Sequence, residues 1–241
     1  GSRVHVVPKQ VAIDGPVLTI RKFPEPITMQ KLISYGSITT EAASFLNQAV
    51  RAGYNIFISG GTGSGKTTFL NALSGFIPKE ERIITIEDSA ELQIRHIPNL
   101  VRLETRAESR DGAKEISMRD LIRASLRMRP DRIIVGEVRG AEAVEMLQAM
   151  NTGHDGSIST GHGNSPADML TRLETMVLMA ADLPLAAVKH QIASALDLLI
   201  HVSRMRDRSR RVVEISEVTG YEDGEVRLET IYRFTETSAA G

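Results

Sequence analysis

A glycine-rich segment at residues 60–67 has the residue types and spacing of a phosphate-binding loop. Its sequence, Gly-Gly-Thr-Gly-Ser-Gly-Lys-Thr, matches the Walker A pattern. Glycines let the backbone curl so that successive N–H groups point at phosphate oxygens, while Lys66 can reach the β- and γ-phosphates and the Thr67 hydroxyl can ligate Mg²⁺. The predicted nucleotide-binding residues are Gly60, Gly61, Thr62, Gly63, Ser64, Gly65, Lys66, Thr67 and Thr68.

The neighbours of this loop support a nucleoside triphosphate site. The apolar run 54–59 predicts a buried strand directly before the loop, and residues 67–73 begin a helix whose N-terminus favours an anion. The alternative, a flexible Gly/Ser-rich linker, does not explain a Lys-Thr pair held between a strand and a helix.

Two acidic residues each follow a short apolar strand. Glu137 follows the strand predicted at 131–136, and Glu87 ends the strand predicted at 82–87, with Asp88 next to it. The carboxyl ends of strands are where α/β sheets bind ligands, so one carboxylate can serve Mg²⁺ and the other the attacking water. The structural alternatives are that Glu137 caps the helix after Gly140 and that Asp88 caps a turn.

Two histidines flank the short strand predicted at 156–160. His162 follows the strand and is the better candidate to contact a γ-phosphate, whereas His154 could equally well orient the loop. Neither has the cysteine or clustered acids around it that a metal site would need. Arginines are also frequent near these segments, and one or two of them should neutralise transition-state charge if the site lies between subunits. The arginines concerned are Arg21, Arg95, Arg102, Arg106, Arg127, Arg129, Arg132 and Arg139.

Composition bounds the class of protein. The chain has 241 residues, a net charge of −1, 24% charged and 41% apolar residues and no cysteine, which is typical of a globular protein without disulfides. Near-neutral charge argues against a general affinity for nucleic acid or anionic membranes. No apolar run reaches the roughly 20 residues of a membrane span.

The elements that must position these residues alternate between strand and helix. A mostly parallel sheet covered on both faces is therefore the predicted α/β fold. Asp223-Gly224 lies between two alternating segments and predicts an antiparallel C-terminal hairpin. The expected strands are 4–6, 17–21, 54–59, 82–87, 100–104, 131–136, 156–160, 212–216 and 226–230, and the expected helices are 28–34, 39–52, 67–73, 118–128, 141–150 and 166–180.

Taken together, the four segments resemble the secretion-superfamily ATPases of type II and type IV secretion and pilus assembly. Residues 60–67, 83–92, 131–137 and 152–166 match that family's Walker A, Asp box, Walker B and His box. The stretches 126–140 and 146–157 are most similar to the tight-adherence (Flp) pilus ATPases. The resemblance extends over nearly all of residues 11–220.

This resemblance implies a RecA-like P-loop domain at residues 27–241, with residues 1–26 forming the tail of a truncated N-terminal domain and a linker. It implies a homo-hexamer with Mg²⁺ and ATP between subunits, cytoplasmic and peripheral to the inner membrane, where it contacts platform proteins of a pilus or secretion system. Glu87 would be the general base, Glu137 the Walker B acid that serves the metal with Thr67, and His162 the γ-phosphate sensor. Arg21 would reach the nucleotide from the N-terminal side.

The sequence departs from the family pattern at two positions. Gly163 follows His162 where the family usually has alanine, and the segment 207–210, Asp-Arg-Ser-Arg, lacks the glycine of the usual Asp-Gly-Ser-Arg. We expect the fine geometry after His162 and the turn before the terminal hairpin to differ accordingly.

The predicted function is an ATP-hydrolysing motor for pilus assembly or protein secretion. Within the family, a conjugation-type type IV secretion ATPase or a pilus retraction ATPase is the alternative. A RecA-like nucleic-acid motor would need a basic channel, which near-neutral charge and 4% aromatic residues do not favour, so no direct nucleic-acid partner is expected. An inert nucleotide-binding scaffold would be favoured only without Glu87 or Glu137.

Overall fold

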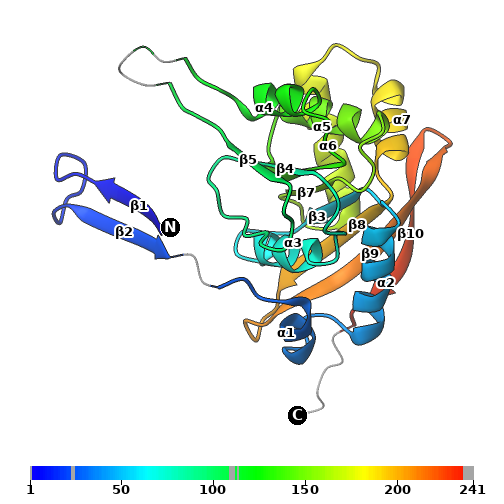
Figure 1. Cartoon of the computed structure of the whole chain (residues 1–241), viewed down its shortest axis with the longest axis horizontal. Coiled ribbons are helices and arrows are strands. Elements are labelled where there is room, and N and C mark those ends of the chain that lie inside the picture. The colour runs from blue at the N-terminus through cyan, green and yellow to red at the C-terminus, as the bar shows by residue number, and fades with distance from the viewer. Residues whose placement is uncertain (1, 23–24, 109–111, 113, 236–241) are drawn as a thin grey trace.

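An eight-stranded sheet forms the centre of the protein in the computed structural model, which describes residues 2–22, 25–108, 112 and 114–235 (Figure 1). The strand order is β10-β9-β8-β3-β7-β6-β4-β5, and every pairing from β8 to β5 is parallel. The strands are β3 (Ile56–Ser59), β4 (Ile83–Glu87), β5 (Leu100–Glu104), β6 (Arg132–Val138), β7 (Ile158–Gly161), β8 (Leu198–Arg204), β9 (Arg210–Glu222) and β10 (Glu225–Arg233). The prediction of a mostly parallel sheet with a C-terminal hairpin is confirmed.

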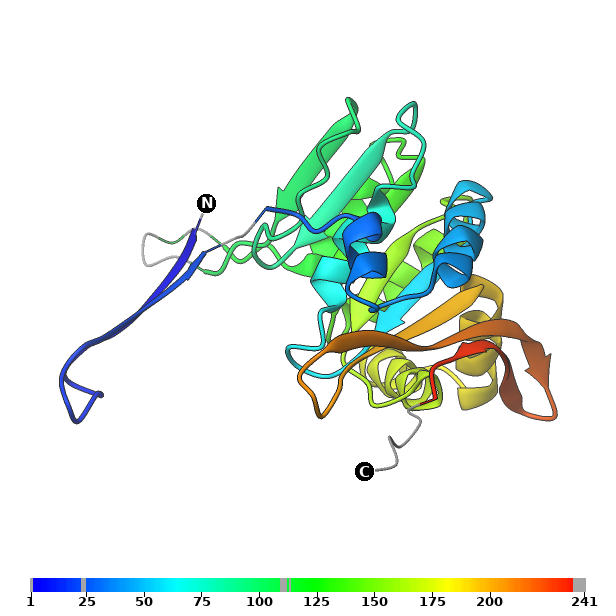
Figure 2. The same cartoon turned by 90° about the horizontal axis from the view of Figure 1, so that it is seen from below.

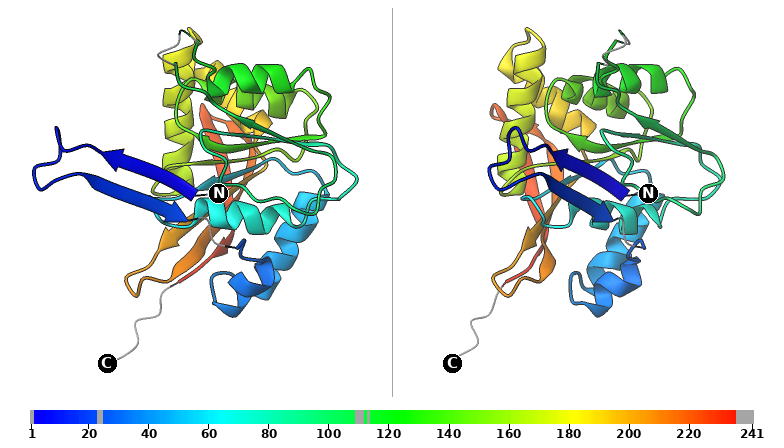
Figure 3. Two further views of the ribbon diagram at one scale, coloured as in Figure 1. Left: turned by 60° about the vertical axis from the view of Figure 1, so that its left-hand side comes forward. Right: turned by 90° about the vertical axis from the view of Figure 1, so that its left-hand side faces the viewer.

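Helices cover both faces of this sheet (Figures 1 and 3). The two core clusters follow the alternation of strand side chains, since Ile56 and Ile58 pack on one face and Phe57 on the other. The first face carries α1 (Met29–Ser34), α2 (Thr40–Arg51) and α3 (Lys66–Ser74), and the second carries α4 (Met118–Ser125), α5 (Glu142–Asn151), α6 (Pro166–Ala180) and α7 (Leu185–Ala195). Within the described residues, no helix is both long and apolar enough to cross a membrane.

Local signals account for several element ends. The Ser165 hydroxyl accepts a hydrogen bond from the Asp168 N–H, and Pro166 occupies the first turn of α6, as predicted. Asp223 and Gly224 have φ angles of 52° and 80°, which is the backbone of a two-residue hairpin turn. These short motifs begin or end elements without help from distant residues.

Other boundaries differ from the sequence prediction. The α-helix at 118–128 ends at Ser125, and Arg129, whose φ is 54°, precedes Pro130, which disfavours helical backbone before it. Neither α7 nor β8 was predicted from the sequence. Residues 198–202 are buried on both sides between β3 and β9, so their near-continuous apolar run carried no periodicity to separate strand from helix.

The N-terminal hairpin stands apart from the eight-stranded sheet (Figures 1 and 2). Strands β1 (Ser2–Val7) and β2 (Val17–Lys22) pair only with each other within the described residues. Apolar side chains on both strands are more than half exposed, for example Val6 and Leu18. A domain boundary near residue 26 remains a prediction.

Candidate nucleotide-binding site

The phosphate loop connects β3 to α3 through glycines that the geometry requires. Gly63 and Gly65 have φ angles of 72° and 99°, a conformation that side chains disfavour. A Cβ atom on Gly60 would lie 2.3 Å from the Val202 carbonyl oxygen, so this position needs glycine because β8 passes so close. The N–H groups at the start of α3 then point into the loop.

Lys66 is the first residue of α3 and is only 8% exposed. Its Nζ donates to the carbonyl oxygens of Gly60, at 3.0 Å, and Gly61, at 3.2 Å. Burial lowers the pKa of Lys66, and the nearby Glu137 carboxylate partly opposes that shift. The ammonium group is therefore held at the mouth of the loop, where phosphate oxygens would compete with two neutral carbonyls.

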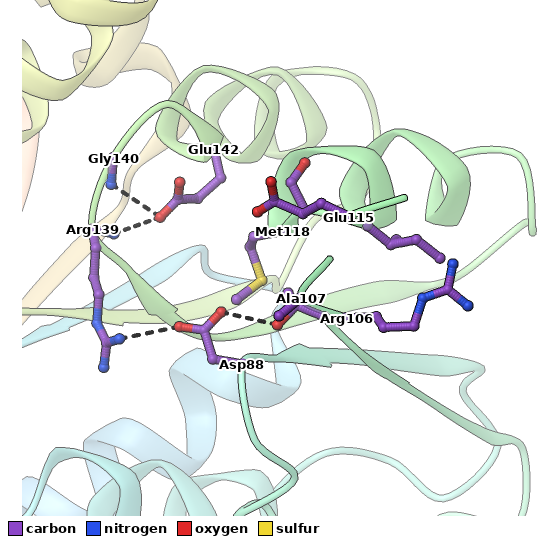
Figure 4. Close-up of a pocket in the computed structure, with 11 residues that line it drawn as sticks. Asp88, Arg106, Ala107, Glu115, Met118, Arg139, Gly140 and Glu142 are labelled. Carbon is purple, nitrogen blue, oxygen red and sulfur yellow. Dashed lines mark hydrogen bonds and ion pairs between the residues drawn. The ribbon is translucent and has the colours of Figure 1, made fainter. Parts of the chain in front are cut away.

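Glu137 lies at the end of β6, where the register with β7 shifts between Val135 and Val138. Its Oε1 lies 2.9 Å from His162 Nε2 and 3.9 Å from Lys66 Nζ. Its Oε2 accepts hydrogen bonds from Arg139. Glu137 does not cap the following helix α5, whose N-cap is Ala141. Instead Glu142, in the first turn of α5, accepts the N–H groups of Arg139 and Gly140 through its Oε1 (Figure 4).

Glu87 ends β4, the neighbour of β6 on the side away from β7, and is 4% exposed. Its Oε1 accepts the backbone N–H groups of Glu91, at 2.9 Å, and Leu92, at 2.8 Å. Burial raises the pKa of Glu87, although these two hydrogen bonds lower it. A Cβ atom on Gly136 would lie 2.9 Å from Glu87 Cγ, so the glycine before Glu137 makes room for the second carboxylate.

The two histidines lie in different surroundings. His162 Nδ1 is 3.4 Å from Lys66 Nζ, which places the ring between the lysine and Glu137. Burial first, and then the charge of Lys66, lower the pKa of His162 below its usual value, so the neutral ring is favoured. His154 Nδ1 instead lies 3.3 Å from the Ala149 carbonyl oxygen, near the C-terminal end of α5.

Arg21 reaches the rim of this site from β2. Its Nη2 lies 3.1 Å from Glu91 Oε1, and the side chain is 62% exposed. Because the Glu91 N–H donates to Glu87, Arg21 is linked through one residue to the buried carboxylate. Several of the other arginines named from the sequence have partners elsewhere, such as Arg132, which is buried and paired with Glu81.

Except for Gly60 and Gly61, the predicted site residues line a single cleft of about 750 Å³, a size typical of small-molecule sites. It is bounded by the phosphate loop, the acidic strand ends, Arg21 and the turn between β8 and β9. Within the described residues, no group of three or more acidic, histidine or cysteine side chains could hold a metal ion alone. Mg²⁺ is usually held by one or two protein oxygens together with phosphates and water, so Thr67 and Glu137 fit a nucleotide-bound Mg²⁺.

A smaller cavity of about 380 Å³ adjoins this cleft (Figure 4). Asp88 and Arg139 line both spaces, and Asp88 Oδ2 lies 3.1 Å from Arg139 Nη1. Arg139 thus contacts two carboxylates, Asp88 and Glu137. From the sequence, Arg139 was only one of eight candidate arginines, although its place two residues after Glu137 was a usable signal.

The two departures from the family pattern, at Arg208 and Gly163, affect the backbone conformation of one turn and the packing after His162. Arg208 has a φ of 70°, so a non-glycine residue adopts the left-handed backbone that glycine prefers. A Cβ atom on Gly163 would lie 3.3 Å from the Cβ and Sδ atoms of Met169, so glycine there leaves room for that buried side chain.

Comparison with known proteins places these features in one family. The model of the family described as type II/IV secretion system protein matches residues 2–232. A putative conjugal transfer protein from Mycobacterium tuberculosis is 42% identical over 231 residues, which cover 95% of this chain and 65% of that protein. The type IV secretion system protein PtlH from Bordetella pertussis is 44% identical over 187 residues, which cover 75% of this chain and 53% of that protein.

Solved structures agree with this assignment. The VirB11 ATPase from the Brucella suis type IV secretion system, crystallised with sulphate, has a TM-score of 0.67 at 30% identity, over 90% of this chain and 71% of that one. The pilus retraction motor PilT with bound ADP has a TM-score of 0.61 over 98% of this chain and 64% of that one, and at 24% identity it supports the fold alone. A closer likeness to the tight-adherence ATPases stays a prediction.

Proposed function

Because this chain belongs to the type II/IV secretion system protein family, we propose that it binds Mg·ATP and hydrolyses it to ADP and phosphate, driving pilus assembly or protein secretion. One observation carries the proposal. Lys66, Glu87, Glu137 and His162 come from three strand ends and one helix, and all line one cleft with the phosphate loop. The chain spans 65% of the length of the mycobacterial relative, so the activity and partners of the whole protein are part of the proposal.

Each side chain has a distinct part in the proposed reaction. Lys66 would exchange the carbonyls of Gly60 and Gly61 for β- and γ-phosphate oxygens. Mg²⁺, held through Thr67 and Glu137, would neutralise charge on the same phosphates. Glu87 would accept the proton of the attacking water, and burial suits it to this task because a carboxylate with a raised pKa is a stronger base.

His162 is placed to respond to the γ-phosphate. Its neutral ring lies between Lys66 and Glu137, so a change at either residue alters its surroundings. We propose that His162 reports the presence of the γ-phosphate and couples its loss to movement of the loop after β7.

The proposed motor is a homo-hexamer with nucleotide between subunits, working at the cytoplasmic side of the inner membrane with platform proteins. The exposed Arg21 at the rim supports a site completed by arginines of the N-terminal side or of a neighbouring copy. The alternatives within the family are a conjugation-type type IV secretion ATPase and a type IV pilus retraction ATPase. The description of the mycobacterial relative as a putative conjugal transfer protein favours the first. We propose no direct nucleic-acid partner, since the net charge is −1.

ATP hydrolysis by purified Lys66→Ala protein tests this function. We expect turnover to fall by about 10³-fold and nucleotide affinity to weaken, because Lys66 is the one cationic residue within the phosphate loop, residues 60–67. Lys79→Ala removes an exposed lysine outside the cleft and is the matched control. Wild-type turnover in folded Lys66→Ala protein would refute the proposal, and stimulation of the wild type by DNA would favour the nucleic-acid motor.

A further inference from the structure

The proposed reaction leaves the other side of the phosphate loop without a role. In the sheet, β7, β6 and β4 lie on one side of β3 and bring His162, Glu137 and Glu87. On the other side lie β8 and then β9. For a nucleotide whose γ-phosphate faces the first group, we expect the α-phosphate and nucleoside to extend away from it, toward β8 and β9.

Strand β8 supports the loop from this second side. It runs parallel to β3 with Ser59 opposite His201, and Ser59 Oγ lies 2.8 Å from His201 Nδ1. One residue further on, the Val202 carbonyl passes so close to Gly60 that no Cβ atom would fit. The start of the phosphate loop is therefore fixed against β8.

The turn that follows β8 carries the chain back over the loop. The Met205 N–H donates to the Ser209 carbonyl at 2.8 Å, and the Arg208 N–H donates to the Met205 carbonyl at 3.0 Å. The Ser209 N–H also donates to Asp207 Oδ1 at 2.8 Å. These short-range bonds define the turn and set the position of Arg210, the first residue of β9.

Arg210 lies directly on the phosphate loop. Its Nε donates to the Gly63 carbonyl at 2.9 Å, although 147 residues separate the two in sequence. A Cβ atom on Gly65 would lie 3.2 Å from Arg210 Cδ, so the side chain also packs against the glycine at the N-cap of α3. The arginine thus spans the part of the loop that surrounds phosphate.

The rest of the Arg210 guanidinium faces the cleft. Within the described part of the chain, its Nη1 and Nη2 atoms make no hydrogen bond or ion pair, and the side chain lines the cleft. The neighbouring Arg211 differs, since its Nη1 donates to the Gly36 carbonyl at 2.7 Å and its guanidinium lies 4.8 Å from the Phe234 ring centre. Arg210 therefore combines a fixed Nε with free donors, and paired donors in a plane suit phosphate oxygens.

We infer that Arg210 binds the α-phosphate of the nucleotide through its Nη1 and Nη2 groups while its Nε holds the loop at Gly63. The inference rests on the nucleotide binding proposed above. It assigns the turn between β8 and β9 a direct part in binding both ATP and ADP, because both carry an α-phosphate. A contact with the γ-phosphate would instead distinguish the two nucleotides.

Calorimetric titration with three Mg²⁺-bound ligands tests this inference: ADP, a non-hydrolysable ATP analogue and pyrophosphate. We expect Arg210→Ala to weaken the affinity for each of the two nucleotides by about tenfold. The affinity for pyrophosphate, which has no nucleoside-linked phosphate, should weaken by less than about twofold. Arg210→Lys keeps the charge without the planar donors, so its nucleotide affinity should lie between those of the wild type and Arg210→Ala. Arg206→Ala, an exposed arginine in the same turn, should bind all three ligands as the wild type does.

Each other result overturns the inference. An equal loss for pyrophosphate would mean that Arg210 only supports the loop, and a loss confined to the ATP analogue would place it at the γ-phosphate. Unchanged affinities in a variant with the wild-type melting temperature would remove Arg210 from the site. If the wild-type protein bound none of the ligands, the proposed function itself would fail, so the two failures are distinguishable.

Discussion

The two sides of β3 bring different chemistry to the same phosphate loop. On the side of β7, β6 and β4, the residues at the strand ends are a histidine and two carboxylates, and Glu87 is almost fully buried. On the side of β8 and β9, His201 lies beneath the loop and Arg210 lies across it. One side holds groups that can accept or move protons, and the other holds donors and structural hydrogen bonds.

This difference follows from how the strands connect. Parallel strands joined by crossovers all present their carboxyl ends at one edge, so residues from β4, β6 and β7 meet there. Strands β8 and β9 are antiparallel and joined by a short turn, which projects over the loop from the same edge. We therefore expect changes on the first side to alter turnover and changes on the second to alter affinity or stability.

The largest effect expected on the first side is that of Glu87→Gln. Without the base, turnover should fall by about 10²–10³-fold while Mg·ATP affinity stays near that of the wild type. Glu137→Gln should in addition lose nucleotide affinity at low Mg²⁺, because this side chain serves the metal. Turnover and binding measured across a range of Mg²⁺ concentrations separate the two roles.

The matched control for both carboxylates is Glu104→Gln. Glu104 ends β5 in register with Glu87, but it lies outside the cleft. Its loss should leave turnover unchanged. Equal defects in turnover and binding for the Glu87 and Glu137 variants would contradict the division of labour.

A smaller effect is expected for His162→Ala. The ring contacts Lys66 and Glu137 but supplies no charge of its own when neutral, so ATP affinity should be largely kept. We expect weaker coupling between hydrolysis and movement, measured as a lost difference in protease sensitivity between the ATP-bound and ADP-bound protein. His154→Ala is the control, and a lower melting temperature with unchanged coupling would show that His162 only packs.

Arg21→Ala tests whether a third region joins the two sides of the loop. Its exposed pairing with Glu91 adds little stability, so the variant should fold as the wild type does. If Arg21 neutralises charge in the transition state, turnover should fall more than nucleotide affinity. Mixing Arg21→Ala with Lys66→Ala protein should restore some ATPase activity if Arg21 acts on a neighbouring copy. Arg95→Ala, which removes a similarly exposed pair with Glu25, is the control, and turnover unchanged by Arg21→Ala would exclude Arg21 from the reaction.

The smallest expected effect lies on the second side, at His201. Burial lowers the pKa of His201, although Glu214 and Asp168 oppose the shift and Lys66 adds to it. A histidine with a lowered pKa contributes stability that is present above its ordinary value of about 6.5 and is lost as pH falls. We expect the free energy of unfolding, measured with denaturant, to fall less between about pH 7.5 and about pH 5.5 in His201→Gln than in the wild type. Equal losses in both proteins would contradict a buried, neutral ring.

Much of the first side could be predicted from sequence. Residues 60–67 identify the loop by themselves, and each of Glu87 and Glu137 directly follows an apolar run that predicts a strand. The sequence did not indicate that Gly136 would be the position that accommodates Glu87, because that contact depends on β4 and β6 being neighbours. The second side was largely missed, since β8 was not predicted and the strand predicted at 212–216 covers only part of β9.

The sequence by itself determined the features that are encoded within a few consecutive residues. These are the phosphate loop, the acidic strand ends, the cap of α6 and the turn at Asp223-Gly224, where local backbone preferences and hydrogen bonds suffice. The tertiary structure alone decided that His201 lies under Ser59, that Arg21 is linked to Glu87 through Glu91, and that Arg210 meets Gly63. The physical reason is that these contacts join residues 70 to 147 positions apart. The contacts of His201 and Arg210 depend on burial of the apolar strands in one sheet order, and that of Arg21 depends on where the separate N-terminal hairpin lies.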